Sequence, residues 1–102
     1  MIMKVARGPF YVYILSNHNR TVLYIGITND LRRRLGEHRM GRESSFVHRY
    51  NLRDLVYFEE FAEPYGAIRR EKQLKNWHRE SKFGLIRRVN PNLRDVSDDL
   101  PL

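Results

Sequence analysis

The sequence predicts an α+β domain, in which a small three-stranded antiparallel sheet is flanked by helices in the order ββαβαα. Two runs of aromatic and β-branched residues, 10–15 and 22–27, are separated by a short polar loop, which is typical of an antiparallel hairpin. Apolar residues recur at helical spacing on either side of a third such run, 55–61. The 102 residues suffice for one compact domain and are too few for two.

In the hairpin, tyrosines and a glycine alternate with aliphatic residues, so that they occupy opposite faces. A four-residue loop over 17–20 would set Tyr13 opposite Tyr24, and Tyr11 opposite Gly26. The aliphatic face would then meet the core, and the glycine would leave room for the close approach of a ligand. An aromatic pair packed under a helix is the alternative interpretation.

Capping residues set the predicted helix boundaries. Asp30 ends a run of cap-forming residues before the first helix, and Pro64 can occupy the first turn of the second. The predicted spans are 31–39 for the first helix, 64 to about 78 for the second and 81–88 for the third, with an irregular segment at 41–51. We divide the chain into an N-terminal arm (1–9), a domain (10–95) and an acidic tail (96–102), and expect the chain to be loose from Asn92 onward.

The charge of the chain favours a phosphate-bearing partner. Nineteen Lys and Arg against twelve Asp and Glu give a net charge of +7, and most of the cations are arginine, which suits bidentate phosphate contacts. A solvated basic surface, or attraction to anionic lipid, would give the same composition. The absence of cysteine excludes disulfides and thiolate metal sites. No apolar stretch is long enough for a membrane span or a signal peptide, so we expect a cytoplasmic protein.

Helical periodicity selects one arginine from the run at 32–34. At 100° per residue, Arg34 and His38 fall within about 60° of Leu31, on the buried side of the first helix. A guanidinium held there could clamp a phosphate and offset the charge of its transition state. A snorkelling arginine at the edge of the core is the alternative.

Glu71 interrupts the apolar stripe of the second helix, which includes Ala67, Ile68 and Leu74. A buried carboxylate without a partner costs several kcal/mol, so such a residue normally has a cation or a metal beside it. A metal ion and an ion pair with Lys75 or Arg34 both remain open from the residues alone.

Together these segments resemble the GIY-YIG nucleases. Tyr11-Val12-Tyr13 and Tyr24-Ile25-Gly26, ten residues apart, resemble the two halves of the signature, with Tyr11 in place of its first glycine. The stretch 29–35 with His38 is similar to the family's first helix, and 67–74 to the helix that bears its metal-binding glutamate. The stretch 90–95 resembles the closing motif of small stand-alone bacterial members, with Leu93 where tryptophan is usual and Asn90 as the match to a late asparagine.

The resemblance implies a divalent-metal-dependent endonuclease that hydrolyses phosphodiester bonds of DNA, in preference to RNA, in repair or recombination. It implies that Tyr13 is the general base, tuned by Tyr24 and His38, and that a phenolate would need cations near it because a free phenol has a pKa near 10. It also implies that Glu71 holds one Mg²⁺ or Mn²⁺ ion. The implied catalytic residues are Tyr13, Tyr24, Arg34, His38 and Glu71, and the expected backbone contacts are Arg32, Arg33, Arg69, Arg70 and Lys75.

Two other classes of function remain open. A non-catalytic nucleic-acid-binding module could share this fold and charge, and a protein-interaction domain could carry the charge incidentally. The joint presence of Tyr13, Tyr24, Arg34 and Glu71 favours the nuclease. The sequence assigns no role to His48, no substrate structure and no oligomeric state.

Overall fold

A computed structural model describes residues 8–41 and 45–100 of the chain. It confirms the α+β class and the order ββαβαα, and adds a short helix within the predicted irregular segment. The elements are β1 (Phe10–Ser16), β2 (Leu23–Thr28), α1 (Leu31–Arg39), α2 (Ser45–Arg49), β3 (Asp54–Phe61), α3 (Pro64–Asn76), α4 (Arg79–Val89) and the 3-10 turn η1 (Ser97–Asp99). As predicted, Asp30 caps α1, where its carboxylate accepts a hydrogen bond from the backbone N–H of Arg33.

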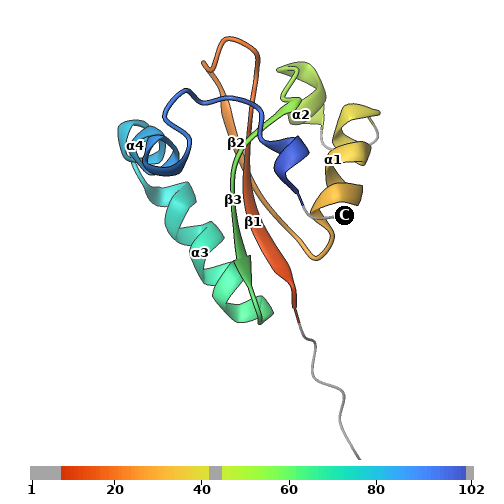
Figure 1. The fold of residues 1–102 in the computed structure, drawn as a ribbon, viewed down its shortest axis with the longest axis vertical. Helices are drawn as coiled ribbons and strands as arrows, with labels where there is room; N and C mark the ends of the chain where they lie inside the picture. Colours follow the sequence, from red (N-terminus) through yellow and green to blue (C-terminus); the bar gives the residue numbers. More distant parts are fainter. Residues whose placement is uncertain (1–7, 42–44, 101–102) are drawn as a thin grey trace, which may run out of the picture.

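The sheet is antiparallel with the strand order β2-β1-β3, and helices cover both of its faces. Figure 1 shows α1 and α2 on one side of the sheet and α3 and α4 on the other. One buried cluster joins Tyr13 and Leu15 to Leu35 of α1, and a second joins Val12 and Ile14 to residues of α3 and α4. The hairpin face that carries the phenols is therefore part of a core, as is the aliphatic face.

The hairpin register differs by two residues from the prediction. Tyr13 pairs with Gly26 and Leu15 with Tyr24, because the loop spans six residues, 17–22, instead of four. Asn17 organises the longer loop, since its side-chain oxygen accepts hydrogen bonds from the backbone N–H groups of Thr21 and Val22. A slip of two residues leaves every side chain on its predicted face.

A β-bulge in β3 shifts its pairing with β1. Ile14 pairs with Tyr57 and Leu15 with Leu55, so that Val56 is the extra residue. As a result Val56 and Tyr57, although adjacent in the chain, both belong to the cluster beneath α3 and α4.

The expectation of a loose C-terminal tail is wrong for the residues described. Val96 and Leu100 are buried in the cluster that contains Leu35, and the backbone N–H of Val96 donates to the carbonyl of Leu55 at 2.7 Å. The carboxylate of Asp95 accepts from the backbone N–H of Leu55 and from Arg39. The segment therefore closes the α1 side of the domain. Among the helices described, none has the length and apolar character to cross a membrane.

Candidate active site

A buried hydrogen bond links β1 to α1 at the centre of the candidate site. The phenol oxygen of Tyr13 lies 2.8 Å from Nε2 of His38, and the two side chains are 0% and 4% exposed. Gly26 lies directly across from Tyr13, and a Cβ added to it would come within 2.4 Å of Cζ and of the phenol oxygen. The glycine therefore makes room for the Tyr13 ring, and not for a ligand as the sequence suggested.

Tyr24 completes a cluster of three rings with Tyr13 and His38, which we call the phenol–imidazole cluster. The Tyr24 ring centroid lies 6.3 Å from that of Tyr13 and 5.8 Å from that of His38. Tyr24 is only partly buried and lines a surface hollow at the edge of β2, together with Phe46 and others. Because Tyr13 has no exposed surface in this structure, Tyr24 is the phenol of the cluster that solvent can reach.

Arg34 lies one helical turn before His38 on α1. It is partly buried, whereas Arg32 and Arg33 are exposed, which confirms the choice that periodicity made among the three. Its Nη1 lies 3.8 Å from Oε1 of Glu37, a weak pair at the surface. The guanidinium thus shares a helix face with His38, the imidazole that binds Tyr13.

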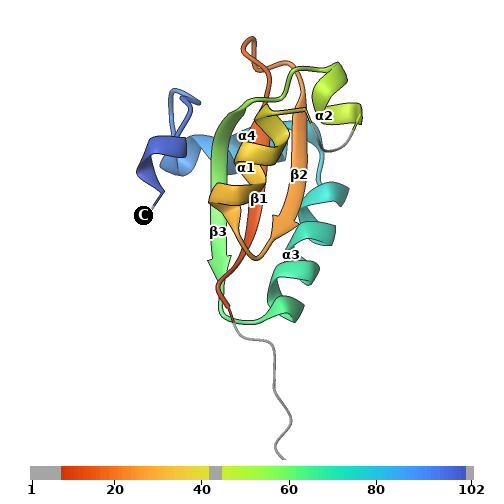
Figure 2. The ribbon, with the colours of Figure 1, turned by 90° about the vertical axis from the view of Figure 1, so that its right-hand side faces the viewer.

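Glu71 lies on α3, which belongs to the other side of the sheet from α1. Figure 2 shows α3 running beside β2, at the edge of the sheet, and Lys75 of α3 lines the same hollow as Tyr24. The Glu71 side chain is 18% exposed, and its Oε2 lies 3.4 Å from Nζ of Lys75. Of the alternatives that the sequence left open, the structure forms the ion pair with Lys75, whose side chain is 53% exposed. Arg34 lies on α1, and a metal ion at Glu71 stays a prediction.

The donors near Glu71 fit a hard cation that keeps most of its waters. In the described ranges, no three His, Cys, Asp or Glu side chains are grouped closely enough to hold a metal by themselves. A single carboxylate is nevertheless sufficient for Mg²⁺, which prefers oxygen ligands and takes the others from water and substrate phosphate. The same set does not suit Zn²⁺, which requires three or four protein ligands.

Arg70, which we predict to contact nucleic acid, connects α3 to β3 in this structure. Its guanidinium donates to both carboxylate oxygens of Glu59 on β3, at 2.9 and 3.2 Å from Nε, and to Gln73. It also lies over the Trp77 ring, 5.2 Å from the centroid. These contacts fasten α3 to β3 and engage Nε, Nη1 and Nη2 of the guanidinium.

The same contacts shift two pKa values. Burial, followed by the hydrogen bond to Glu59, raises the pKa of Tyr57 to about 12. Burial alone would raise the pKa of Glu59, but hydrogen bonds from Arg70 and Tyr57 outweigh it and hold that pKa below its usual value.

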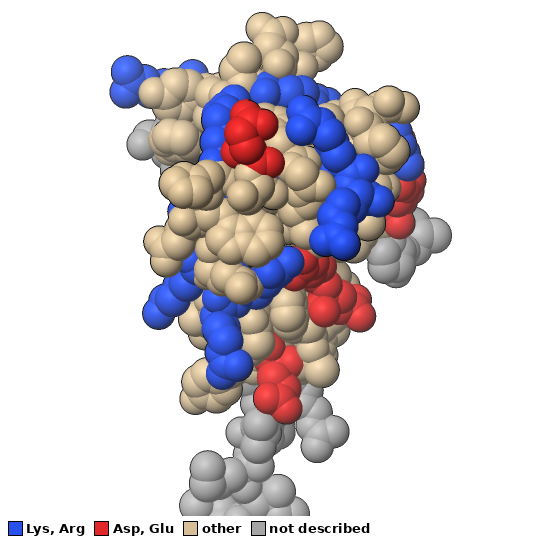
Figure 3. Space-filling model, turned by 90° about the vertical axis from the view of Figure 1, so that its left-hand side faces the viewer, with Lys and Arg blue, Asp and Glu red and all other residues tan. Residues whose placement is uncertain are grey.

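The other predicted backbone contacts fall on two sides of the sheet. Arg32 and Arg33 belong to α1, whereas Arg69 and Lys75 belong to α3. Figure 3 shows the face formed by α3 and α4, where lysine and arginine side chains are spread widely with acidic side chains between them. The expected contacts therefore come from elements on two sides of the sheet.

Two residues near the motifs have clear positions. The buried amide of Asn90 donates to the carbonyls of Val56 and Arg94 and accepts from the backbone N–H of Arg94, so its hydrogen-bonding groups hold the C-terminal segment. His48, on α2, lines a small hollow together with His38.

Comparison with known proteins agrees with this architecture. The family model of the GIY-YIG catalytic domain matches residues 9–84 of the sequence, about three quarters of the chain. The chain belongs to the GIY-YIG family. Tyr13, Tyr24, Arg34, His38 and Glu71 all lie within the matched range, and Asn90 lies beyond it.

Relatives of this GIY-YIG protein occur in bacteria and archaea. A UPF0213 protein of Pseudomonas aeruginosa is 37% identical over 87 residues, which cover 85% of this chain and 82% of the relative. A UPF0213 protein of Natronomonas pharaonis is 34% identical over 76 residues, which cover 74% of this chain and 88% of the relative. The solution structure of a UPF0213 protein from Bacillus halodurans matches with a TM-score of 0.53 and 26% identity, over 87% of this chain and 94% of that one. The fold is therefore the nuclease-like fold of the family.

Proposed function

We propose that this GIY-YIG protein is an endonuclease that hydrolyses phosphodiester bonds of DNA with the help of one divalent metal ion. The observation that carries the proposal is the buried hydrogen bond between Tyr13 and His38 beside the accessible Tyr24. The buried pair packs against the ring of Tyr24 and fixes an accessible phenol in place, a group that can take a proton in hydrolysis and that a binding module does not need. The net charge of +7 supports a polyanionic substrate.

The accessible phenol is the group that meets water in this mechanism. Tyr24, as phenolate, accepts a proton from a water molecule whose oxygen bonds to phosphorus. The bond from phosphorus to the 3′-oxygen breaks, and the departing oxygen takes a proton from solvent water. Tyr13 and His38 act through Tyr24 and hold it in position, which revises the role of general base that the resemblance implied for Tyr13. Arg34 binds the phosphate and offsets the charge that builds on it in the transition state.

Glu71 is the residue that would hold the metal, as Mg²⁺ or Mn²⁺. When bound, the ion supplies positive charge to the phosphate and to the departing oxygen. The chain itself then has to provide the base and the guanidinium that binds the phosphate.

The test is cleavage of labelled DNA and RNA of several structures, incubated with Mg²⁺ and with Mn²⁺. We expect Glu71→Ala and Arg34→Ala each to lower the cleavage rate by about 10² or more, because each removes an electrostatic stabiliser of the transition state. We expect Tyr24→Phe to lower it by about 10² and Tyr13→Phe by about tenfold, since the second acts through the first.

The matched controls are Glu63→Ala and Arg88→Ala. Glu63 is exposed and makes no side-chain capping hydrogen bond at the start of α3, and Arg88 is exposed near the end of α4. Both controls should cleave at nearly the wild-type rate. Wild-type cleavage by Glu71→Ala would refute the metal site, and a larger loss for Tyr13→Phe than for Tyr24→Phe would return the role of base to Tyr13.

A further inference from the structure

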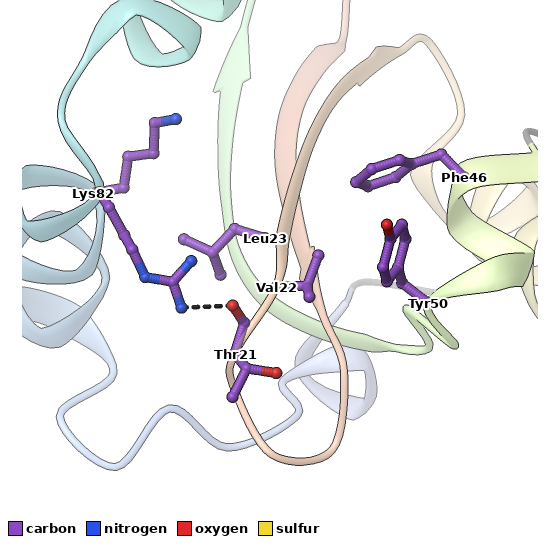
Figure 4. Close-up of a pocket in the computed structure, with 7 residues that line it drawn as sticks. Thr21, Val22, Leu23, Phe46, Tyr50 and Lys82 are labelled. Atoms are coloured by element: carbon purple, nitrogen blue, oxygen red, sulfur yellow. Dashed lines mark hydrogen bonds between the residues drawn. The ribbon is translucent and has the colours of Figure 1, made fainter.

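A groove runs along the outer edge of β2, between α2 and the start of α4. Two overlapping hollows of about 310 Å³ each form it, and both are lined by Leu23, Phe46 and Lys82. Figure 4 shows Phe46 and Tyr50 on one side of the strand and Lys82 on the other, with Val22 and Leu23 between them. The second hollow extends to Tyr24, so the groove begins at the phenol–imidazole cluster and leads away from it.

One wall of the groove is aromatic. The rings of Phe46 and Tyr50 lie 4.7 Å apart between centroids, and the two residues are 42% and 40% exposed. Phe46 also lies 6.3 Å from Tyr24, which lies 6.3 Å from Tyr13. A row of four rings therefore leads from the buried phenol to the surface. Large aromatic rings left this exposed indicate a ligand with a flat, apolar face.

The opposite wall is cationic. Lys75, Arg79 and Lys82 line it. The guanidinium of Arg79 is held in place, since it donates to the carbonyl of Thr21 and lies over the Phe83 ring, 5.0 Å from the centroid. Lys75 contacts Glu71, so this wall ends beside the residue proposed to hold the metal. Three cations in a row attract a ligand with repeated negative charges.

We infer that the groove binds nucleotides next to the scissile phosphate, with an unpaired base stacked on Phe46 and Tyr50 and the backbone phosphates beside Arg79 and Lys82. The inference rests on the proposed function. A nucleic-acid strand combines the two features that the walls require, because its bases stack on aromatic rings and its phosphates face cations. A base within a duplex has both faces covered by its neighbours, so only an unpaired or extruded base can stack on Phe46. The groove thus favours substrates with unpaired nucleotides beside the cut.

The test is binding, measured by fluorescence anisotropy in EDTA, where the metal is removed and no cleavage occurs. The probes are a short labelled single strand, the matching duplex and a strand of abasic residues of the same length. We expect Phe46→Ala to weaken binding of the single strand about tenfold, because one stacked base is lost. The same variant should weaken binding of the duplex by less than about twofold. Wild-type protein should bind the abasic strand about as weakly as Phe46→Ala binds the single strand.

Matched variants separate stacking from charge and from folding. Phe46→Tyr keeps the ring and should bind like the wild type, whereas Tyr65→Ala removes an exposed ring of α3 outside the groove and should change nothing. Lys82→Ala should weaken binding of both nucleic acids and reduce the slope of log affinity against log salt by about one, an effect that Lys72→Ala, outside the groove, should not produce.

Equal losses of single strand and duplex with Phe46→Ala, or no loss at all, would overturn the inference. Displacement of the strand by an acidic peptide of equal charge would overturn it as well, since the aromatic wall would then make no contribution. Failure of the groove and failure of the proposed function are separable. If cleavage depends on Glu71 but binding does not depend on Phe46, only the groove is refuted. If binding depends on Phe46 but no cleavage that depends on Glu71 is found, only the nuclease is refuted.

Discussion

At the scale of single residues, Gly26 explains why the second tripeptide of the signature ends in glycine. The ring of Tyr13 crosses over it, and a methyl group would lie 2.4 Å from the phenol. We expect Gly26→Ala to destabilise the protein by about 1–3 kcal/mol, as overpacking of a buried site commonly does. The substitution should also displace Tyr13 from His38 and lower cleavage. Urea unfolding followed by circular dichroism, together with the cleavage assay, checks both effects.

Gly84 provides the control for this substitution. It lies within α4, and a Cβ added there would meet no atom within 4 Å. Gly84→Ala should therefore stabilise the protein by about 0.5–1 kcal/mol, the usual gain in helix propensity. Wild-type stability in Gly26→Ala would mean that the Tyr13 ring can move aside without cost. Packing would then not be what fixes the hydrogen bond between Tyr13 and His38.

The sequence was sufficient to locate Arg34, Tyr13 and Tyr24 because the periodicity that selects each of them lies within a single helix or hairpin. Helical periodicity alone distinguished Arg34 from Arg33, and strand alternation alone placed Tyr13 and Tyr24 on one face. The hydrogen bond between Tyr13 and His38 was not predictable in the same way, because it depends on how α1 packs against the sheet. The position of Glu71 on the other side of the sheet depends likewise on the path of the chain.

At the scale of elements, the contact between β3 and α3 predicts a specific response to alkaline pH. Tyr57 has a pKa of about 12 in the folded protein, against about 10 in an unfolded chain. Below pH 10 both states keep the proton, so the contribution of this group to the free energy of unfolding does not change with pH. Between pH 10 and 12 the unfolded state loses its proton first, and the stability that Tyr57 contributes is lost as the pH rises.

Replacement of Tyr57 by phenylalanine should remove that response. We expect Tyr57→Phe to be about 1 kcal/mol less stable at neutral pH, since the hydrogen bond to Glu59 is lost, and to lose less stability than the wild type between pH 10 and 12. Urea unfolding at a series of pH values measures the difference. Tyr65→Phe, at a ring that is 74% exposed, serves as the control and should follow the wild-type curve. Parallel curves for the wild type and Tyr57→Phe would contradict the assignment.

Several features of the elements were beyond sequence reasoning for identifiable reasons. The hairpin register depends on Asn17, whose side chain caps a six-residue loop that composition does not distinguish from a four-residue one. The bulge at Val56 places Val56 and Tyr57 on the same side of the sheet, which strict alternation along a strand cannot predict. The helix α2 has five residues, too short to give a periodic signal, although Phe46 on α2 and Tyr50 directly after it are four apart and their rings are in contact.

At the scale of the whole molecule, the sheet separates the proposed catalytic groups into two sets. Arg34 and His38 come from the layer of α1, and Glu71 comes from the layer of α3. Tyr24 lies on the edge strand β2, and the hollow that it lines with Lys75 is where the two layers meet. A site of this kind depends on both layers being held firmly to the sheet. For α3 the contact between Arg70 and Glu59 does this, and for α1 the C-terminal segment does it.

The C-terminal segment therefore provides a test of the whole architecture. Removal of residues 95–102 would expose the core that Val96 and Leu100 cover and would leave Arg39 without its partner Asp95. Burial of one Val and one Leu side chain contributes about 3–5 kcal/mol in total, so the truncated protein should lose at least about 3 kcal/mol of stability. Cleavage should fall with it, because the layer that carries Arg34 and His38 loses its support. Asp98→Ala, at an exposed position, should leave both properties unchanged. A truncated protein as stable as the full chain would show that α1 is held by the sheet alone.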